Sequence, residues 1–84
     1  MYYVYALKSL KDGKFYIGFT QDLKKRLQAH NHGRVMSTCN RIPLEVVYYE
    51  ASRDINDAIK REKYLKTTYG KRYLANRLKS DLKG

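Results

Sequence analysis

Two short aromatic and β-branched runs on either side of an Asp-Gly pair constrain the fold of this chain more than any other feature. The runs are Tyr2 to Ser9 and Phe15 to Thr20, and Asp12-Gly13 between them is a strong signal for a tight turn. The sequence therefore predicts an antiparallel hairpin. A turn centred on this pair makes the numbers of paired residues sum to an odd value, so Tyr5 and Tyr16 should face the same side of the sheet.

The next segment predicts a helix followed by a third strand. Asp22 can cap a helix in which Leu23, Arg26, Leu27 and His30 share one face, because they are spaced at i, i+3, i+4 and i+7. Gly33 should end that helix, and residues 34–41 read as a polar loop. The run from Leu44 to Glu50, preceded by Pro43, predicts a strand.

The last third of the chain predicts two more helices. Asp54 or Asn56 can cap the first, whose apolar face consists of Ile55, Ala58, Ile59, Glu62, Leu65 and Tyr69, with Gly70 ending it. Residues 71–83 predict a final helix built on Leu74, Leu78 and Leu82. The order ββαβαα predicts a single α+β domain over residues 1–84, with a small sheet covered by helices.

Charge and cysteine content narrow the class of partner and the compartment. Eighteen Lys and Arg against 8 Asp and Glu give a net charge of +10, which favours nucleic acid over an inert basic surface. No helix combines a wide apolar face with a lysine-rich face, so an anionic membrane is a weaker candidate. Cys39, the one cysteine, cannot form an internal disulfide, and the longest apolar run is far shorter than a membrane span. We therefore expect a cytoplasmic protein that does not bind membranes.

Glu62 is an anomaly, since a carboxylate within an apolar helical stripe loses hydration unless a cation lies beside it. The cation could be Arg61, Arg26 or another base, in a purely structural ion pair. Alternatively Glu62 could be a single carboxylate ligand for Mg²⁺, with water and substrate phosphate as the other ligands. Both interpretations remain open from the residues alone.

Arg26 and His30 form a second anomaly, one helical turn apart beside two leucines. Such an arginine often extends to solvent, and such a histidine is often a satisfied residue at the rim of a core. In a functional site, the guanidinium would match phosphate oxygens and the imidazole would move a proton near neutral pH. Tyr5 and Tyr16, on one face of the hairpin, could join them if adjacent cations favoured a phenolate.

In this order, the residues resemble the GIY-YIG nuclease superfamily, and in particular its short stand-alone bacterial members. These are related to the nuclease domain of an excision-repair endonuclease subunit and to homing endonucleases. Tyr3-Val4-Tyr5 stands at the first motif, Tyr16-Ile17-Gly18 is the second motif intact, and Asp22 to His30 resembles the first helix. Arg61-Glu62-Lys63 is similar to the acidic helix of the family. Tyr3 replaces the glycine of the first motif, which would change one edge of the cleft.

The resemblance implies a three-stranded antiparallel sheet flanked by helices and a phosphodiesterase that uses one divalent metal. Glu62 would hold Mg²⁺ or Mn²⁺, and Tyr5 would act as the base that activates water. Tyr16 would position that water or the phosphate. Arg26 would stabilise the scissile phosphate, and His30 would assist proton transfer or phosphate binding.

The resemblance also implies supporting residues and a substrate. Gly18 and Asn76 would order the site without touching substrate. DNA is favoured over RNA, read by structure or weakly by sequence, with DNA repair as the default role and a protein partner or homodimer completing recognition. A non-catalytic nucleic-acid-binding module is the alternative. Further contacts to nucleic acid are expected in the hairpin, the first helix and the central loop, with a solvated role as the alternative for each: Lys8, Lys14, Lys24, Ser37, Thr38, Asn40 and Arg41.

Overall fold

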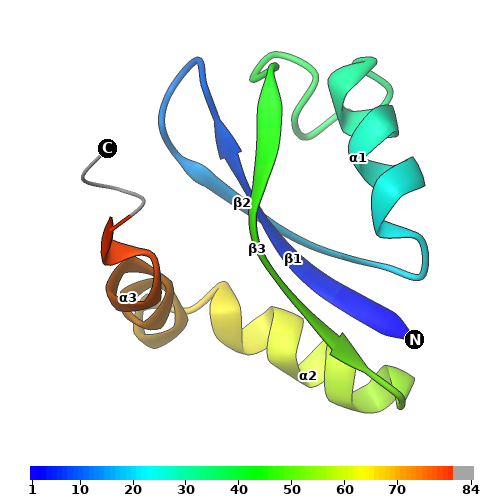
Figure 1. The fold of residues 1–84 in the computed structure, drawn as a ribbon, viewed down its shortest axis with the longest axis vertical. Coiled ribbons are helices and arrows are strands. Elements are labelled where there is room, and N and C mark those ends of the chain that lie inside the picture. Colours follow the sequence, from blue (N-terminus) through cyan, green and yellow to red (C-terminus); the bar gives the residue numbers. More distant parts are fainter. Residues whose placement is uncertain (81–84) are drawn as a thin grey trace.

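The computed structural model describes residues 1–80 and has the α+β architecture and the ββαβαα order predicted from the sequence (Figure 1). The elements are β1 (Tyr2–Ser9), β2 (Phe15–Thr20), α1 (Leu23–Asn31), β3 (Leu44–Ser52), α2 (Ile55–Leu65) and α3 (Thr68–Arg77). The strands form one antiparallel sheet in the order β2-β1-β3, so β1 is the central strand. Within the described part of the chain, no helix is long and apolar enough to cross a membrane.

The β1–β2 hairpin has the parity that the sequence predicts. Tyr5 lies opposite Gly18 and Leu7 lies opposite Tyr16, so each pair of numbers sums to 23. A turn centred on Asp12-Gly13 would give 25, so the centre of the hairpin lies one residue earlier than predicted, while the parity is the same. Gly13 in the connecting turn has φ +70°, a left-handed conformation that glycine adopts without steric cost. The rings of Tyr5 and Tyr16 consequently lie on one face of the sheet, with their centroids 6.5 Å apart.

Helices cover the two faces of the sheet separately, with α1 on one side and α2 and α3 on the other (Figure 1). The α1 side contains Tyr5, Leu7 and Leu44, packed against leucines of α1. The opposite side is the larger core, and its buried members are Val4, Ala6, Ile17, Ala58, Leu65 and Leu74. Alternate residues of the central strand therefore point into different cores, and the odd-numbered ones point toward α1.

The predicted helix caps on α1 and α2 are confirmed. The Asp22 carboxylate accepts a hydrogen bond from the backbone N–H of Lys25, and the Asp54 carboxylate accepts one from the N–H of Asn56. Gly33 follows α1 with φ +72°, as expected of a glycine that ends a helix.

The predicted boundary between the last two helices is wrong. Gly70 does not end α2, which stops at Leu65. Thr67 instead caps α3, and Gly70 is buried in the first turn of that helix. A Cβ at position 70 would overlap the backbone of Tyr64 and Leu65, so glycine serves the close approach of α3 to the end of α2. Tyr69 is 72% exposed and does not continue the α2 stripe. The predicted helix residues Leu82 and Lys83 lie outside the described residues.

Candidate active site

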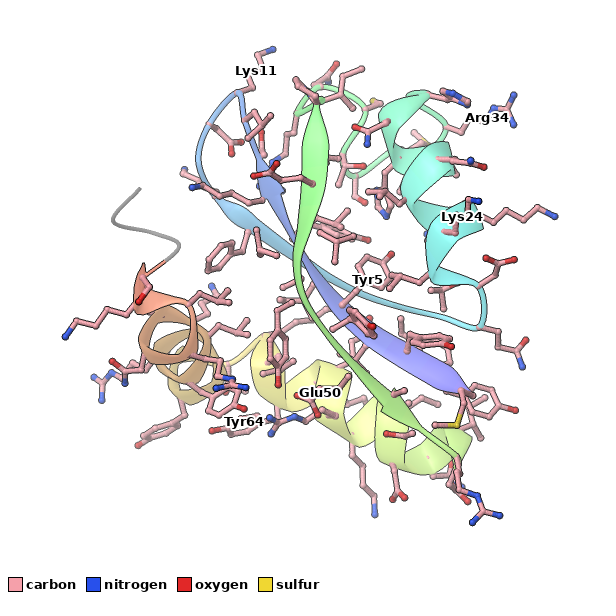
Figure 2. The ribbon with its side chains drawn as sticks, in the orientation of Figure 1. Tyr5, Lys11, Lys24, Arg34, Glu50 and Tyr64 are labelled. Carbon is pink, nitrogen blue, oxygen red and sulfur yellow. The ribbon has the colours of Figure 1, made fainter. Side chains whose placement is uncertain are left out.

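Tyr5 lies at the centre of the site, on the sheet face covered by α1. Its side chain is buried, and its ring crosses the backbone of Gly18 on β2. A Cβ at position 18 would overlap the ring and hydroxyl of Tyr5. The bare backbone at Gly18 thus leaves space for the Tyr5 ring. The Tyr5 side chain extends from β1 toward α1 (Figure 2), where its hydroxyl meets Arg26.

His30, in the last turn of α1, contacts that hydroxyl. Its Nε2 is 2.9 Å from the Tyr5 oxygen, and its Nδ1 is 2.7 Å from the Thr38 hydroxyl. Burial, aided by the positive charge of Arg26, lowers the pKa of His30 to about 4. The imidazole is therefore neutral at pH 7, so one ring nitrogen carries no proton and can accept a hydrogen bond.

Arg26 lies one turn earlier on α1, and its Nε donates to the Tyr5 hydroxyl at 3.4 Å. This hydrogen bond raises the pKa of Arg26, which stays a cation. Burial raises the pKa of Tyr5, while Arg26 opposes the rise and the nearby groups Tyr16 and Glu62 add to it. In the protein alone, Tyr5 is a protonated phenol held between a cation and a neutral base.

Tyr16 completes this group, which we call the Tyr5 cluster: Tyr5, Tyr16, Arg26 and His30. The Tyr16 ring meets the His30 ring edge-on, with centroids 5.1 Å apart. Its hydroxyl accepts a hydrogen bond of 3.3 Å from Ser37 in the central loop. The structure thus brings together both motif tyrosines with both polar residues of the α1 stripe.

Glu62 comes from α2, in the opposite layer, yet its charge contributes to the raised pKa of Tyr5. It therefore lies within electrostatic reach of the Tyr5 cluster. The cation beside Glu62 is Lys66, whose Nζ lies 3.3 Å from the carboxylate. Arg61 does not pair with Glu62, because its Nε pairs with the Glu50 carboxylate at 2.8 Å. The Lys66 partner is one helical turn away and more than half exposed, so it holds Glu62 only weakly.

Glu62 suits a metal that needs few protein ligands. No group of three His, Cys, Asp or Glu side chains within residues 1–80 is placed to hold an ion. A partly exposed carboxylate with a weak partner can bind Mg²⁺ or Mn²⁺ when water and substrate phosphate supply the other ligands. The donor set therefore fits a hydrated divalent ion shared with a phosphate.

The model of the GIY-YIG catalytic domain matches residues 1–78. The chain belongs to the GIY-YIG family. Similar curated proteins of this size are UPF0213 proteins: one from Lacticaseibacillus paracasei is 41% identical over 66 residues, covering 77% of this chain and 73% of the relative. One from Clostridium perfringens is 43% identical (79% of this chain, 71% of the relative), and one from Staphylococcus saprophyticus is 39% identical (79% and 80%). No solved structure matches the chain significantly.

Membership of the GIY-YIG family agrees with the sequence interpretation of the motifs and implies a nucleic-acid substrate and a divalent metal. Tyr3, which replaces the motif glycine, pairs with Tyr49 at 6.1 Å between ring centroids. It lines an apolar groove of about 550 Å³ beside α1, together with Leu23 and Leu27. Tyr3 makes no hydrogen bond to the Tyr5 cluster.

The remaining predicted residues of this GIY-YIG domain lie apart from the Tyr5 cluster. Asn76 is exposed on α3 and makes no side-chain hydrogen bond within residues 1–80. Lys14 is exposed in the hairpin, Lys8 is half-buried on β1, and Lys24 extends outward from α1 (Figure 2). The prediction that Thr38 contacts nucleic acid disagrees with the structure, because its side chain is fully buried against His30.

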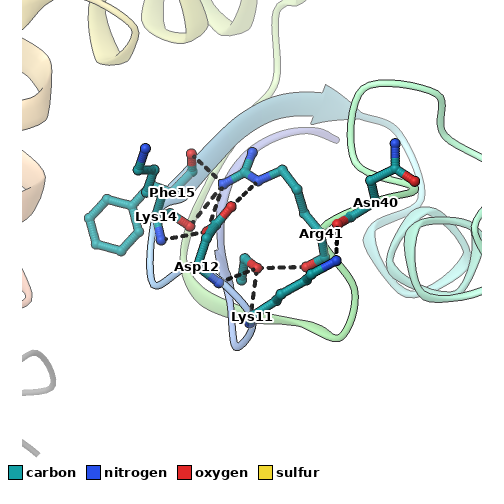
Figure 3. A network of polar contacts seen from close by, with 7 residues as sticks. Lys11, Asp12, Lys14, Phe15, Asn40 and Arg41 are labelled. Atoms are coloured by element: carbon teal, nitrogen blue, oxygen red, sulfur yellow. Dashed lines mark hydrogen bonds and ion pairs between the residues drawn. The ribbon is translucent and has the colours of Figure 1, made fainter.

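Arg41 has a structural contact that the sequence interpretation missed. Its guanidinium pairs with Asp12 at 2.9 Å and donates to the backbone oxygens of Lys14 and Phe15 (Figure 3). Arg41 also lowers the pKa of Asp12 to about 2. Lys11 donates to the Asn40 oxygen beside it. These contacts fasten the central loop to the hairpin, so Arg41 has less freedom to bind phosphate than predicted.

Burial of His30 should make the stability of the domain depend on pH. The pKa is about 4 in the folded state and 6.5 in the unfolded chain, so the unfolded chain binds more protons between these values. We expect the free energy of unfolding to fall by on the order of 3 kcal/mol as pH drops from 6.5 to about 4. Urea unfolding across this range measures it.

Two variants isolate the contribution of His30 to the pH dependence of the free energy of unfolding. His30→Gln should reduce this pH dependence, whereas His32→Gln, at an exposed position, should leave it unchanged. An equal slope in His30→Gln and in the unsubstituted protein would show that another group carries the pH dependence.

Proposed function

We propose that this chain is a one-metal endonuclease that hydrolyses phosphodiester bonds in DNA. The observation that carries the proposal is the Tyr5 hydroxyl, held between the Arg26 guanidinium at 3.4 Å and the neutral His30 imidazole at 2.9 Å. Arg26 opposes the rise that burial causes in the pKa of Tyr5, and a metal ion held nearby would favour the phenolate further, so that Tyr5 could act as a base. The charge of Glu62 acts on Tyr5, which supports Glu62 as the residue that would hold the metal for this site.

Each residue has a role in the proposed hydrolysis. Water attacks the phosphorus while Tyr5, stabilised by Arg26, takes its proton and the Tyr5 proton moves toward Nε2 of His30. The P–O bond to the leaving oxygen breaks, and the proton held by His30 passes to that oxygen. Tyr16 positions that water or the phosphate. The Arg26 fork also binds the phosphate oxygens as their negative charge grows.

Glu62 would hold one Mg²⁺ or Mn²⁺ through its carboxylate. When bound, the ion supplies Lewis-acid stabilisation of the phosphate, which contributes several kcal/mol in such enzymes. Asn76 and Gly18 are proposed as supporting positions, and Lys8, Lys14 and Lys24 as contacts to the DNA backbone. We place the enzyme in the cytoplasm, acting in DNA repair on substrates chosen by structure or weakly by sequence.

A small catalytic domain with a net charge of +10 binds backbone more readily than it reads bases. We therefore propose that a protein partner or a second copy of the chain completes substrate selection. DNA and RNA are separated by the substrate panel in the test below.

The test is cleavage of a labelled panel of single strand, duplex, flap, four-way junction and RNA, with Mg²⁺, Mn²⁺ or EDTA. Tyr5→Phe removes only the hydroxyl and keeps the ring that packs on Gly18. Loss of the base should lower the cleavage rate about 10²- to 10⁴-fold. Tyr49→Phe is the matched control, since its side chain is 56% exposed on β3.

The outcomes separate the enzyme from the alternative. Metal-dependent cutting that survives in Tyr49→Phe and is lost in Tyr5→Phe supports the proposed function. Salt-sensitive binding with no cutting of any substrate under either metal would identify a non-catalytic binding module. Equal cutting by both variants would remove Tyr5 from the mechanism.

A further inference from the structure

Two consecutive residues of the central loop contact two different rings of the Tyr5 cluster. Ser37 donates to the Tyr16 hydroxyl at 3.3 Å, and Thr38 lies 2.7 Å from Nδ1 of His30. Thr38 is fully buried although it belongs to an irregular loop, where polar side chains normally reach water. The short distance and the burial show that this hydroxyl is fixed against the imidazole.

The contacts around Thr38 give its hydroxyl a direction. Its hydroxyl can donate to the Val35 carbonyl, which can only accept and lies 3.5 Å away, a long hydrogen bond. The same oxygen is then free to accept from His30, which requires a proton on Nδ1. Nε2 is left without a proton and accepts from the Tyr5 hydroxyl, whose oxygen in turn accepts from Arg26.

The opposite tautomer leaves one buried donor unpaired. With the proton on Nε2, Thr38 would donate to Nδ1, while the Val35 carbonyl would keep the backbone N–H of Thr38 at 3.0 Å. The Tyr5 oxygen would accept from both His30 and Arg26, and its own proton would have no acceptor in the cluster. A buried donor without a partner costs about 1 to 3 kcal/mol. Every buried side-chain N or O atom within residues 1–80 has a hydrogen-bond partner, and only the first arrangement gives the Tyr5 proton an acceptor.

We propose that Thr38 is a positioning residue that holds His30 in the Nδ1–H tautomer, so that Nε2 faces Tyr5 as a proton acceptor. The consequence for catalysis rests on the proposed function, because the tautomer decides whether His30 can take the proton of Tyr5. The tautomer itself is a property of the folded chain and needs no substrate.

Long-range ¹H–¹⁵N NMR of protein labelled in histidine tests the tautomer directly. The chain has 2 histidines, and exposed His32 serves as an internal reference. At pH 7 we expect the ¹⁵N shifts of His30 to show a protonated Nδ1 and a bare Nε2. The Nε2–H pattern in the unsubstituted protein would overturn the proposal without any variant.

Two substitutions then assign the effect to the Thr38 hydroxyl. Thr38→Val has nearly the same shape but cannot accept a hydrogen bond, so the Nε2–H form should become the major one. Thr38→Ser keeps the hydroxyl and should restore the original pattern. An unchanged Nδ1–H pattern in folded Thr38→Val would show that another group sets the tautomer.

Cleavage kinetics provide the second readout. In Thr38→Val we expect kcat to fall roughly 10- to 100-fold with KM unchanged, and in Thr38→Ser to stay within about threefold of the unsubstituted protein. A lower kcat without the NMR change would overturn the proposal. Absence of any cleavage by the unsubstituted protein would count against the proposed nuclease alone, because the NMR result is obtained without DNA.

Discussion

Replacing Glu62 by glutamine is expected to lower metal-dependent cleavage about 10³-fold or more, while DNA binding in EDTA is retained. Glutamine has the same shape but no charge, and the chain offers no three-residue acidic or histidine group within residues 1–80 to hold the ion instead. The substitution removes only a weak, exposed ion pair with Lys66, so the free energy of unfolding should change by less than about 1 kcal/mol. Single-turnover rates over a Mg²⁺ titration measure the effect.

Glu45→Gln is the matched control for Glu62→Gln. Glu45 is exposed on β3 and forms no ion pair within the described part of the chain. Glu45→Gln removes one negative charge, as Glu62→Gln does, so both variants should bind DNA slightly more tightly than the unsubstituted protein. Cleavage by Glu62→Gln at the rate of Glu45→Gln would show that the ion is held elsewhere or that no ion is needed.

Gly70→Ala should destabilise the fold by about 3 kcal/mol, although helix propensity alone predicts the opposite sign. Alanine in a helix is favoured over glycine by about 1 kcal/mol. At position 70, however, the added methyl group would overlap the Tyr64 carbonyl oxygen and the Leu65 Cα. Backbone atoms cannot rotate away, so α3 would have to move from the end of α2 and loosen the core around Leu65 and Leu74.

Denaturant unfolding of Gly70→Ala measures this cost, with Gly33→Ala as the comparison. Gly33 has open space around it but φ +72°, so alanine there should cost only about 1 kcal/mol of backbone strain. A Gly70→Ala protein as stable as the unsubstituted one would mean that the α2–α3 junction can open without loss of packing.

Short-range signals in the sequence predicted most of the fold. The Asp12-Gly13 pair predicted the parity of the hairpin, though not its centre, and so predicted that Tyr5 and Tyr16 share one face; Asp22 marked the start of α1. These features depend on neighbours within a few residues, where turn and cap chemistry decides the conformation. The Arg26 and His30 stripe was likewise visible, because helical spacing is a local property.

The errors arose where a residue is used by a distant part of the chain. Glycine often ends a helix, but Gly70 lies inside α3 and allows that helix to approach the end of α2 closely. Thr38 is a polar residue in a loop, a kind of position that is usually exposed, but it is buried against His30. Arg41 was predicted to contact nucleic acid, but its guanidinium pairs with Asp12, which lies 29 residues away in the sequence. No local pattern carries such information, since it depends on which surfaces the fold brings together.

The fastening of the central loop by Arg41 has a consequence for how the molecule opens. The loop that carries Ser37 and Thr38 is bound to the hairpin tip through Asp12, Lys14 and Phe15. Local unfolding of that loop must therefore break contacts at the tip, which places the tip and the loop in one cooperative unit. The hairpin turn contacts none of the reacting groups, but its contacts with the loop help to set how long the Tyr5 cluster stays ordered.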